Sequence, residues 1–215
     1  MSKRDWDVWQ SKDVVDEILP ALGKPEGVWG GTRPDWLPKY KSVLDAGCGP
    51  GVFYPILTEN GESYTGIDSS QHMIDIALST YQGVDFRVAD ILNLPFKNGE
   101  YEFVFNNAVL IHMPTDVGFM AAKELVRVAR KYATFNMYTL KETDMVQYLG
   151  DIGILQVYGF ERRDALLEYI KETSDAKVSF ELVEDTPVIV NNVECRTERW
   201  MFKKTGRATS TKDAL

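Results

Sequence analysis

Three glycines spaced two residues apart, Gly47, Gly49 and Gly51, follow a short apolar run in the stretch SVLDAGCGPGVF. A glycine-rich turn after a strand lets part of a cofactor come close to the backbone. A dinucleotide site needs the pattern G-x-G-x-x-G, but the position of its third glycine holds Val52. Asp45, two residues before the first glycine, would repel a pyrophosphate and could orient an ammonium group, directly or through water. The loop therefore favours a cofactor that carries a positive amine beside its nucleoside.

Two further acids stand at the ends of the next two strand-like runs. Asp68 ends the run SYTGID, and Asp90 ends the run VDFRVAD. A carboxylate at the first position can accept hydrogen bonds from both ribose hydroxyls, and one at the second can accept from an adenine amino group. Met73 and Ile91 are apolar neighbours that we expect to sandwich the base, with the Ile91 amide donating to the ring. The three acids together describe a pocket for an adenosine with an amino-acid tail.

Acids at successive strand ends come together only if those strands are parallel neighbours in one sheet. Strand-like runs do recur about every twenty residues, with helical patterns between most of them, which predicts an α/β fold. We expect a three-layer, doubly wound, mostly parallel sheet of about seven strands. The expected parallel strands are 42–46, 63–68, 84–90, 101–109 and 132–138, and the expected helices between them are 52–60, 69–83 and 115–131.

The pattern changes after residue 138. Residues 139–160 are mixed, and a helix is expected at 161–173. Two late strand-like runs, 177–185 and 193–202, are too close together for a helical crossover, so they should form an antiparallel C-terminal hairpin. We therefore expect a single domain over 1–204, with an N-terminal helical cap at 1–40, a cofactor-binding core at 41–138, and a substrate-side insertion and hairpin at 139–204. Residues 205–215 are expected to be a disordered tail.

Bulk composition narrows the classes of function. The chain has 215 residues, a formal net charge of -8 and a pI of about 4.9, which disfavours nucleic acid as a partner. Nowhere do about 18 apolar residues run together, so no membrane span is expected. The two cysteines, Cys48 and Cys195, lack CxxC spacing and no signal peptide is visible, which favours a cytoplasmic protein. With only two histidines, a metal site is poorly supported, and none is expected.

The ordered stretches VLDAGCGPG, YTGIDSSQHMI, VADILNLPF and FNNAVLIHMP, followed by KELVRVARK, resemble the class I S-adenosylmethionine-dependent methyltransferases. They cover roughly residues 41–138 and are most similar to the small-molecule, type 11-like group of that superfamily. The resemblance implies S-adenosylmethionine as cofactor and S-adenosylhomocysteine as product. One departure is the helix before the fifth strand, which lacks the usual Pro-Gly-Gly turn. The expected cofactor-binding residues are Asp45, Gly47, Cys48, Gly49, Gly51, Asp68, Ser69, Met73, Asp90, Ile91 and Asn106.

Two catalytic candidates follow the fourth strand. His112 faces the methyl donor in the family's geometry and has a natural pKa suited to a base, but a satisfied structural histidine is an equal interpretation. Asn106 and Asn107 could hold the amino group of the donor or an oxygen of the acceptor. Their NNAV sequence is not the Asn-Pro-Pro-aromatic signature, so methylation of nucleobase or glutamine amino groups is disfavoured.

The methyl acceptor is expected to lie among aromatic side chains outside the core pattern. Trp9, Tyr54, Tyr138 and Tyr158 are the expected substrate-binding residues, although packing in the core is the commoner role for any one of them. The predicted function is methyl transfer to a small molecule by in-line displacement. The alternatives are a non-catalytic binding or scaffold protein with this fold, or a methyltransferase acting on a protein. The acceptor atom (O, N or C) and the oligomeric state, monomer or homodimer, stay open.

Overall fold

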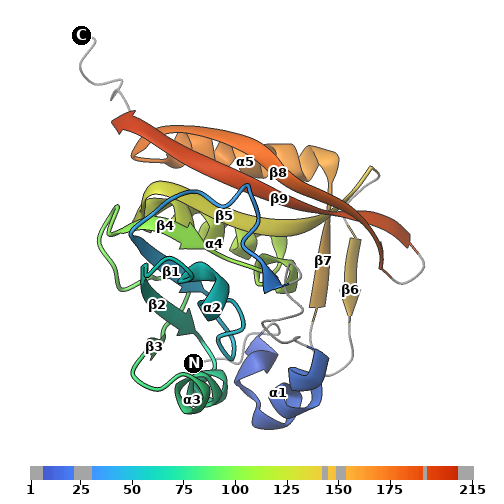
Figure 1. The fold of residues 1–215 in the computed structure, drawn as a ribbon. Helices are drawn as coiled ribbons and strands as arrows, with labels where there is room; N and C mark the ends of the chain where they lie inside the picture. The colour runs from blue at the N-terminus through green and yellow to red at the C-terminus, as the bar shows by residue number, and fades with distance from the viewer. Residues whose placement is uncertain (1–6, 22–30, 142–144, 149–153, 191–192, 208–215) are drawn as a thin grey trace.

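Five parallel strands form the half of the sheet that was predicted to carry the site. The computed structural model of the protein describes residues 7–21, 31–141, 145–148, 154–190 and 193–207 (Figure 1). The five strands lie in the order β3-β2-β1-β4-β5, so the order reverses between β1 and β4. Their carboxyl ends meet at one edge, where open α/β sheets bind ligands. The strands are β1 (Ser42–Ala46), β2 (Ser63–Asp68), β3 (Asp85–Val88), β4 (Tyr101–Phe105) and β5 (Ala129–Leu140).

The predicted C-terminal hairpin is present and is longer than expected. β8 (Ala176–Val190) pairs antiparallel with β9 (Val193–Arg207), and β9 pairs antiparallel with β5. Residues 186–190, expected to connect the two strands, continue β8 because they remain paired with β9. Residues 205–207, expected to begin a disordered tail, belong to β9, whereas 208–215 lie outside the described residues.

A second hairpin was not predicted. β6 (Met145–Tyr148) and β7 (Ile154–Gly159) pair antiparallel, and β7 continues in parallel along the end of β5, from Tyr138 to Leu140. These two strands bring the sheet to nine strands, against about seven expected. Both are short and lie in the stretch whose polar and apolar residues are mixed, so no periodic pattern announced them.

Helices cover both faces of the sheet, which confirms the three layers (Figure 1). α2 (Tyr54–Leu57) and α3 (Gln71–Thr80) pack on one face, and α4 (Thr115–Val128) and α5 (Phe160–Thr173) pack on the other. The Ser70 hydroxyl caps α3 by accepting a hydrogen bond from the Met73 amide at 3.3 Å. α2 is a single turn, shorter than the helix expected over 52–60.

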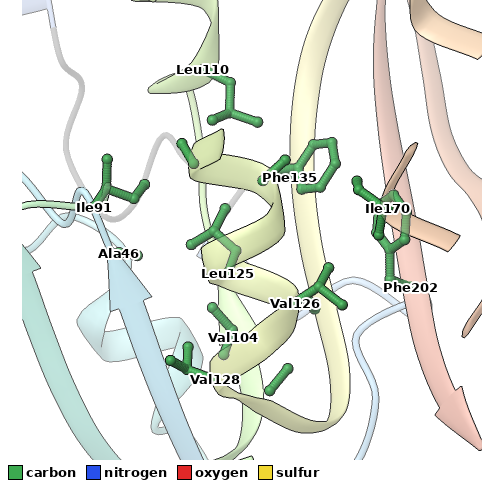
Figure 2. Close-up of a cluster of buried hydrophobic side chains, with 14 of the residues drawn as sticks. Ala46, Ile91, Val104, Leu110, Leu125, Val126, Val128, Phe135, Ile170 and Phe202 are labelled. Carbon is green, nitrogen blue, oxygen red and sulfur yellow. The ribbon is translucent and has the colours of Figure 1, made fainter. Parts of the chain in front are cut away.

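The larger core cluster lies between the sheet and α4. Figure 2 shows Leu125 and Val126 of α4 on the side of the helix that faces Val104 of β4 and Phe135 of β5. Complete burial of such a side chain contributes about 1.5–3 kcal/mol, so this face holds α4 on the sheet. The helix passes directly into β5 at Ala129, without the turn that separates the two in the family pattern. The stretch 129–131, expected as helix, is therefore strand.

Residues 7–21, called the N-terminal segment below, lie against α3. The segment comprises a 3-10 turn (Asp7–Gln10), α1 (Lys12–Ile18) and a second 3-10 turn (Leu19–Ala21). Val15 is fully buried in a small cluster with Met73, and Nε2 of His72 lies 2.8 Å from Oδ1 of Asp16. Apolar packing and a polar contact therefore join the segment to α3. No helix within the described ranges is long and apolar enough to cross a membrane.

Candidate active site

The glycine loop, residues 47–51, is shaped by packing at both ends and is open in the middle. A Cβ on Gly47, whose φ is +80°, would lie 2.2 Å from Cγ2 of Val109. A Cβ on Gly51 would lie 2.9 Å from Cζ of Phe86. At Gly49 the nearest atom would be the Met73 sulfur at 4.0 Å, so this position alone has room around it. Close packing thus explains the outer two glycines, and Gly49 is where a ligand could approach the backbone.

Asp68 joins the end of β2 to the loop. Its Oδ2 accepts a hydrogen bond from the Gly49 amide at 3.0 Å, and its Oδ1 accepts one from the Ser70 amide at 2.9 Å. Burial raises the pKa of this carboxyl, and the backbone amides partly oppose the increase. Ser69, also predicted here, is exposed. The structure therefore places the predicted acid beside the open glycine, where it also fixes the conformation of the loop.

Asp90 lies past the end of β3, at the same edge of the sheet. It is exposed, and its Oδ1 accepts a hydrogen bond from the Leu92 amide at 2.9 Å. The neighbouring strand ends are in register, because Asp68 pairs with Val88 and the Ala89 amide donates to the Asp68 carbonyl. The two acids predicted for one pocket therefore follow adjacent strands.

Asp45 lies behind the loop. Its side chain is 1% exposed, and its Oδ2 accepts a hydrogen bond from the Tyr64 hydroxyl at 2.8 Å. Burial raises the pKa of this carboxyl to about 7, with a smaller contribution from nearby Asp68. The expected direct contact with an ammonium group is not possible in this conformation. Cys48 is also buried, and burial raises the pKa of its thiol, as befits a small core residue.

The sandwich of the base between Met73 and Ile91 stays a prediction, and in this conformation both side chains are buried. Met73 is buried under the N-terminal segment with Val15, on the face covered by α3. Ile91 is buried in the larger core cluster near Ala46, on the face covered by α4 (Figure 2). The two side chains lie in separate clusters because the chain after β3 turns to the opposite face of the sheet. The expected hydrogen bond from the Ile91 amide to the adenine ring stays a prediction.

The turn after β4, residues 106–109, is tied to both neighbouring strands. Asn106 is fully buried, and its Nδ2 donates to the Ala46 carbonyl at the end of β1, at 2.7 Å. Its Oδ1 is buried and has no hydrogen-bond partner in the described part of the chain. Ala108 adopts a left-handed φ of 55°, and its amide donates to Oδ1 of Asn136 at 2.7 Å. A strained residue and an unsatisfied acceptor therefore meet where the strand order reverses, a combination that is common in functional sites.

Arg199 of β9 holds this turn from the side, and the sequence did not reveal it. Its side chain is 2% exposed, and its Nη1 donates to the Asn106 carbonyl at 3.1 Å. Nη2 donates to Oδ1 of Asn107, and Nε donates to Glu184 of β8 at 3.0 Å. The guanidinium lies 5.3 Å from the Trp36 ring centroid, and burial lowers its pKa. Asn107, predicted as catalytic, thus has a structural partner for its side-chain oxygen.

His112 and Trp9 are brought together although they lie far apart in the sequence. His112 ends the short 3-10 helix η4 (Leu110–His112) and is half-buried. Its ring and the Trp9 ring meet edge to face, with centroids 4.8 Å apart. Tyr138, also half-buried, packs against the cluster containing Ile111, and burial raises the pKa of its hydroxyl. These three predicted residues lie on the side of the site reached by the N-terminal segment and β5.

Tyr54 and Tyr158, the other predicted substrate-binding residues, are packing residues. The Tyr54 ring centroid lies 5.0 Å from those of both Tyr64 and Tyr81, in the aromatic cluster behind the glycine loop. Tyr158 is fully buried, and its hydroxyl oxygen would lie only 2.6 Å from a Cβ on Gly118 of α4. Tyr158 is enclosed between a helix and the sheet and has no exposed surface for a substrate in this conformation, whereas Tyr54 is half-buried and its substrate-binding role stays a prediction. In the described part of the chain, no three His, Cys, Asp or Glu side chains form a group able to hold a metal.

Comparison with known proteins finds a family match in the part of the chain that runs from β1 to the start of β5. Residues 43–132 match the family model described as a methyltransferase domain. The malonyl-[acyl-carrier protein] O-methyltransferase of Serratia marcescens is 30% identical over 111 residues, covering 52% of this chain and 42% of that protein. The chain spans less than half the length of the curated relatives it matches.

Solved structures extend the likeness to nearly the whole chain. The magnesium protoporphyrin IX methyltransferase of Synechocystis PCC 6803, crystallised with SAM bound, is 20% identical with a TM-score of 0.55, and the match covers 92% of this chain and 81% of that one. The [4+2]-cyclase SpnF is 14% identical with a TM-score of 0.68, covering 95% and 98%. At these identities the likeness establishes the fold alone, and the two proteins are named for different reactions.

Proposed function

We propose that the chain is a class I S-adenosylmethionine-dependent methyltransferase, which binds S-adenosylmethionine and transfers the methyl group to a small-molecule acceptor; the match to a methyltransferase domain over residues 43–132 supports this. The observation that carries this proposal is the contact between the Asp68 carboxylate and the Gly49 amide at the carboxyl end of the sheet. It joins an acceptor suited to a ribose to the one loop position with open space beside it. S-adenosylhomocysteine would be the product.

The residues at this edge suit the parts of the cofactor. Asp68 and Asp90 offer carboxylate oxygens at neighbouring strand ends, as a ribose and an adenine amino group require. Oδ1 of Asn106 is a buried acceptor without a partner among the described residues, at the reversal between β1 and β4. Gly49 leaves space for the methionine portion to pass.

Methyl transfer from this cofactor requires little from the protein besides alignment of the acceptor with the methyl group. When bound, the cofactor supplies a sulfonium whose methyl group is already activated for in-line displacement. The chain must therefore orient the acceptor and exclude water, and alignment alone can supply effective molarities of about 10⁵ M or more. Arg199 and Asn136 fix the turn that leads to His112, and Trp9 covers one side of its ring. A ring nitrogen of His112 takes the proton when the acceptor is a hydroxyl or a carbon acid.

Isothermal titration with S-adenosylhomocysteine tests the cofactor site. Asp68→Asn keeps the shape of the side chain but removes the charge, so affinity should fall by about tenfold or more. Asp75→Asn is the matched control, because Asp75 is an exposed acid on α3 that accepts a hydrogen bond from the Gln71 side chain. Thermal unfolding of each variant separates lost binding from lost folding. If the folded, unmodified protein does not bind S-adenosylhomocysteine, the proposal is wrong.

A small-molecule acceptor fits the charge of the chain better than a nucleic acid does. The formal net charge of -8 would oppose a phosphate backbone. A cytoplasmic location is part of the same proposal, because both cysteines, Cys48 and Cys195, are free and buried. Incubation with methyl-labelled cofactor and a metabolite extract checks the acceptor: label should enter the small-molecule fraction, and label on protein or RNA would contradict it.

A second candidate keeps the cofactor site without transferring a methyl group. The likeness to the [4+2]-cyclase favours it, because that protein has the same fold and is named for another reaction. This candidate requires tight binding of S-adenosylhomocysteine together with no transfer of label to any fraction of the extract. Transfer of label to a small molecule excludes it.

A further inference from the structure

The end of the β8–β9 hairpin, residues 186–190 and 193–197 and called the hairpin tip below, carries exposed aliphatic side chains. Figure 1 shows this end of the hairpin projecting past β6 and β7. Ile189 is 70% exposed and Val193 is 36% exposed. Contact between water and neighbouring large aliphatic side chains is unfavourable, so such a group commonly marks a surface that another molecule covers.

A hollow of about 930 Å³ lies beside the hairpin tip. Its apolar wall includes Leu140 at the end of β5, Phe160 at the start of α5, and Pro187 and Ile189 of the tip. A projecting apolar segment therefore lies next to a concave surface. Two copies of such a face can fit each other, because the projecting part of each copy enters the hollow of the other.

The charges around the hollow are also self-complementary. Lys141, the residue after β5, and Glu194 of β9 both line the hollow and are both exposed. Arg196 and Asp185 pair with each other, whereas no ion pair joins Lys141 or Glu194 to a residue in the described part of the chain. Glu194 stands opposite Ile189 in the hairpin, so the carboxylate borders the exposed aliphatic side chains.

One cation and one anion on the same surface do not select a ligand of either charge, but they suit a second copy of that surface. In a two-fold interface, if residue i contacts residue j of the other copy, then j contacts i as well. Lys141 of each copy can therefore meet Glu194 of the other. The same two-fold relation brings the aliphatic side chains of the two tips together.

We propose that the chain forms a two-fold homodimer through one surface patch at the hairpin tip. The patch comprises Lys141, Phe160, Pro187, Ile189, Val193 and Glu194. The aliphatic side chains of each tip pack into the hollow of the other copy, and the two Lys141–Glu194 pairs fix the register. The apolar contacts supply most of the affinity, because exposed ion pairs contribute little. The proposal is independent of the proposed methyl transfer.

Sedimentation velocity of the unmodified protein from about 1 to 200 μM tests the association, and a dimer should form within this range. Ile189→Asp puts a carboxylate into the apolar contact twice in each dimer, so it should weaken association about 100-fold. Leu182→Asp is the control, because Leu182 is another exposed aliphatic residue of β8 and does not line the hollow. It should leave association unchanged.

Two charge reversals test the pairing. Lys141→Glu and Glu194→Lys each replace two attractive contacts by repulsive ones, so each should weaken association about tenfold. An equal mixture of the two variants should associate as tightly as the unmodified protein. The new glutamate of one variant then faces the new lysine of the other, and the native Glu194 faces the native Lys141. Lys177→Glu, at an exposed position near the opposite end of β8, changes the net charge as Lys141→Glu does and should have no effect.

Three results would overturn the proposal. The first is an unmodified protein that stays monomeric throughout the concentration range, and the second is equal association of Ile189→Asp and Leu182→Asp. The third is a mixture that associates no more tightly than the two charge variants do separately. Circular dichroism confirms that each variant is folded. A monomer that still binds S-adenosylhomocysteine would leave the proposed methyl transfer intact, so the two proposals can fail separately.

Discussion

Replacing Asp45 with asparagine should remove a large part of the dependence of stability on pH. In the folded protein the Asp45 carboxyl is buried behind the glycine loop, and the Tyr64 hydroxyl donates to it at 2.8 Å. Burial raises its pKa to about 7, because a charge in this position loses its hydration. Asparagine keeps an oxygen that can accept from Tyr64, and it carries no charge at any pH.

The size of the effect follows from the two pKa values of this group. In the unfolded chain an aspartate has a pKa of about 3.9, so it releases its proton about three pH units before the folded protein does. Between these values the folded state binds more protons, so the free energy of unfolding falls as pH rises from about 4 to about 7. Integration gives a cost to folding of about 1.5 kcal/mol at pH 5 and about 4 kcal/mol at pH 8. The difference between Asn and Asp variants should therefore grow by about 2.5 kcal/mol over that interval.

Urea unfolding of both proteins at pH 5 and pH 8 measures this difference. Other titrating groups contribute equally to the two proteins, so they cancel when the variant is compared with the unmodified chain. Asp75→Asn, at an exposed position of α3, should show the same small offset at both pH values. Parallel pH dependences for Asp45→Asn and the unmodified protein would refute the reasoning, because they would mean that Asp45 is ionised in the folded state.

Five further substitutions probe the loop, the turn and the histidine. Gly47→Ala should lower the free energy of unfolding by about 3 kcal/mol, because the new Cβ meets a neighbouring side chain at positive φ. Gly49→Ala should lower it by about 1 kcal/mol and should also lower the affinity for S-adenosylhomocysteine. Urea unfolding measures the first quantity and isothermal titration the second. Arg199→Lys should lower the affinity for S-adenosylhomocysteine about tenfold, whereas Arg163→Lys, on the opposite face of the sheet, should not change it. Equal affinities in the two variants would contradict a role for Arg199 in the turn. His112→Ala should reduce methyl transfer about 100-fold with little change in cofactor affinity, and an unchanged rate would make His112 a structural residue.

The half of the site that could be predicted depends on local spacing. The first two strands have the predicted bounds, 42–46 and 63–68, because short apolar runs ended by glycine or an acid are read directly from the sequence. Once those strands are parallel neighbours, Asp68 must lie beside the glycine loop. The contact between Asp68 and Gly49 therefore follows from where the two parallel strands end, which the sequence predicts.

The half that escaped prediction depends on contacts between distant residues. Arg199 bonds to Asn106 and Asn107 across 93 and 92 residues of sequence, and its run of alternating polar residues reads as an ordinary exposed strand. Tyr54 and Tyr158 are of a residue type that is common in binding sites, but the packing of the folded chain decides whether such a ring is exposed to solvent. β7 shows no alternating pattern because both of its faces are buried: Tyr158 packs in the cluster that contains α4, and Val157 packs in the cluster that contains Ile111.

The N-terminal segment contacts both histidines of the chain, His72 through Asp16 and His112 through Trp9. Imidazole carbon-bound protons resonate in a sparsely occupied part of the proton NMR spectrum, so two histidines give few signals to assign. The ring current of Trp9 displaces those of His112, and the carboxylate of Asp16 sets the surroundings of His72. A one-dimensional spectrum of the unlabelled protein thus reports whether the segment is docked on the site and whether a ligand lifts one end of it or both.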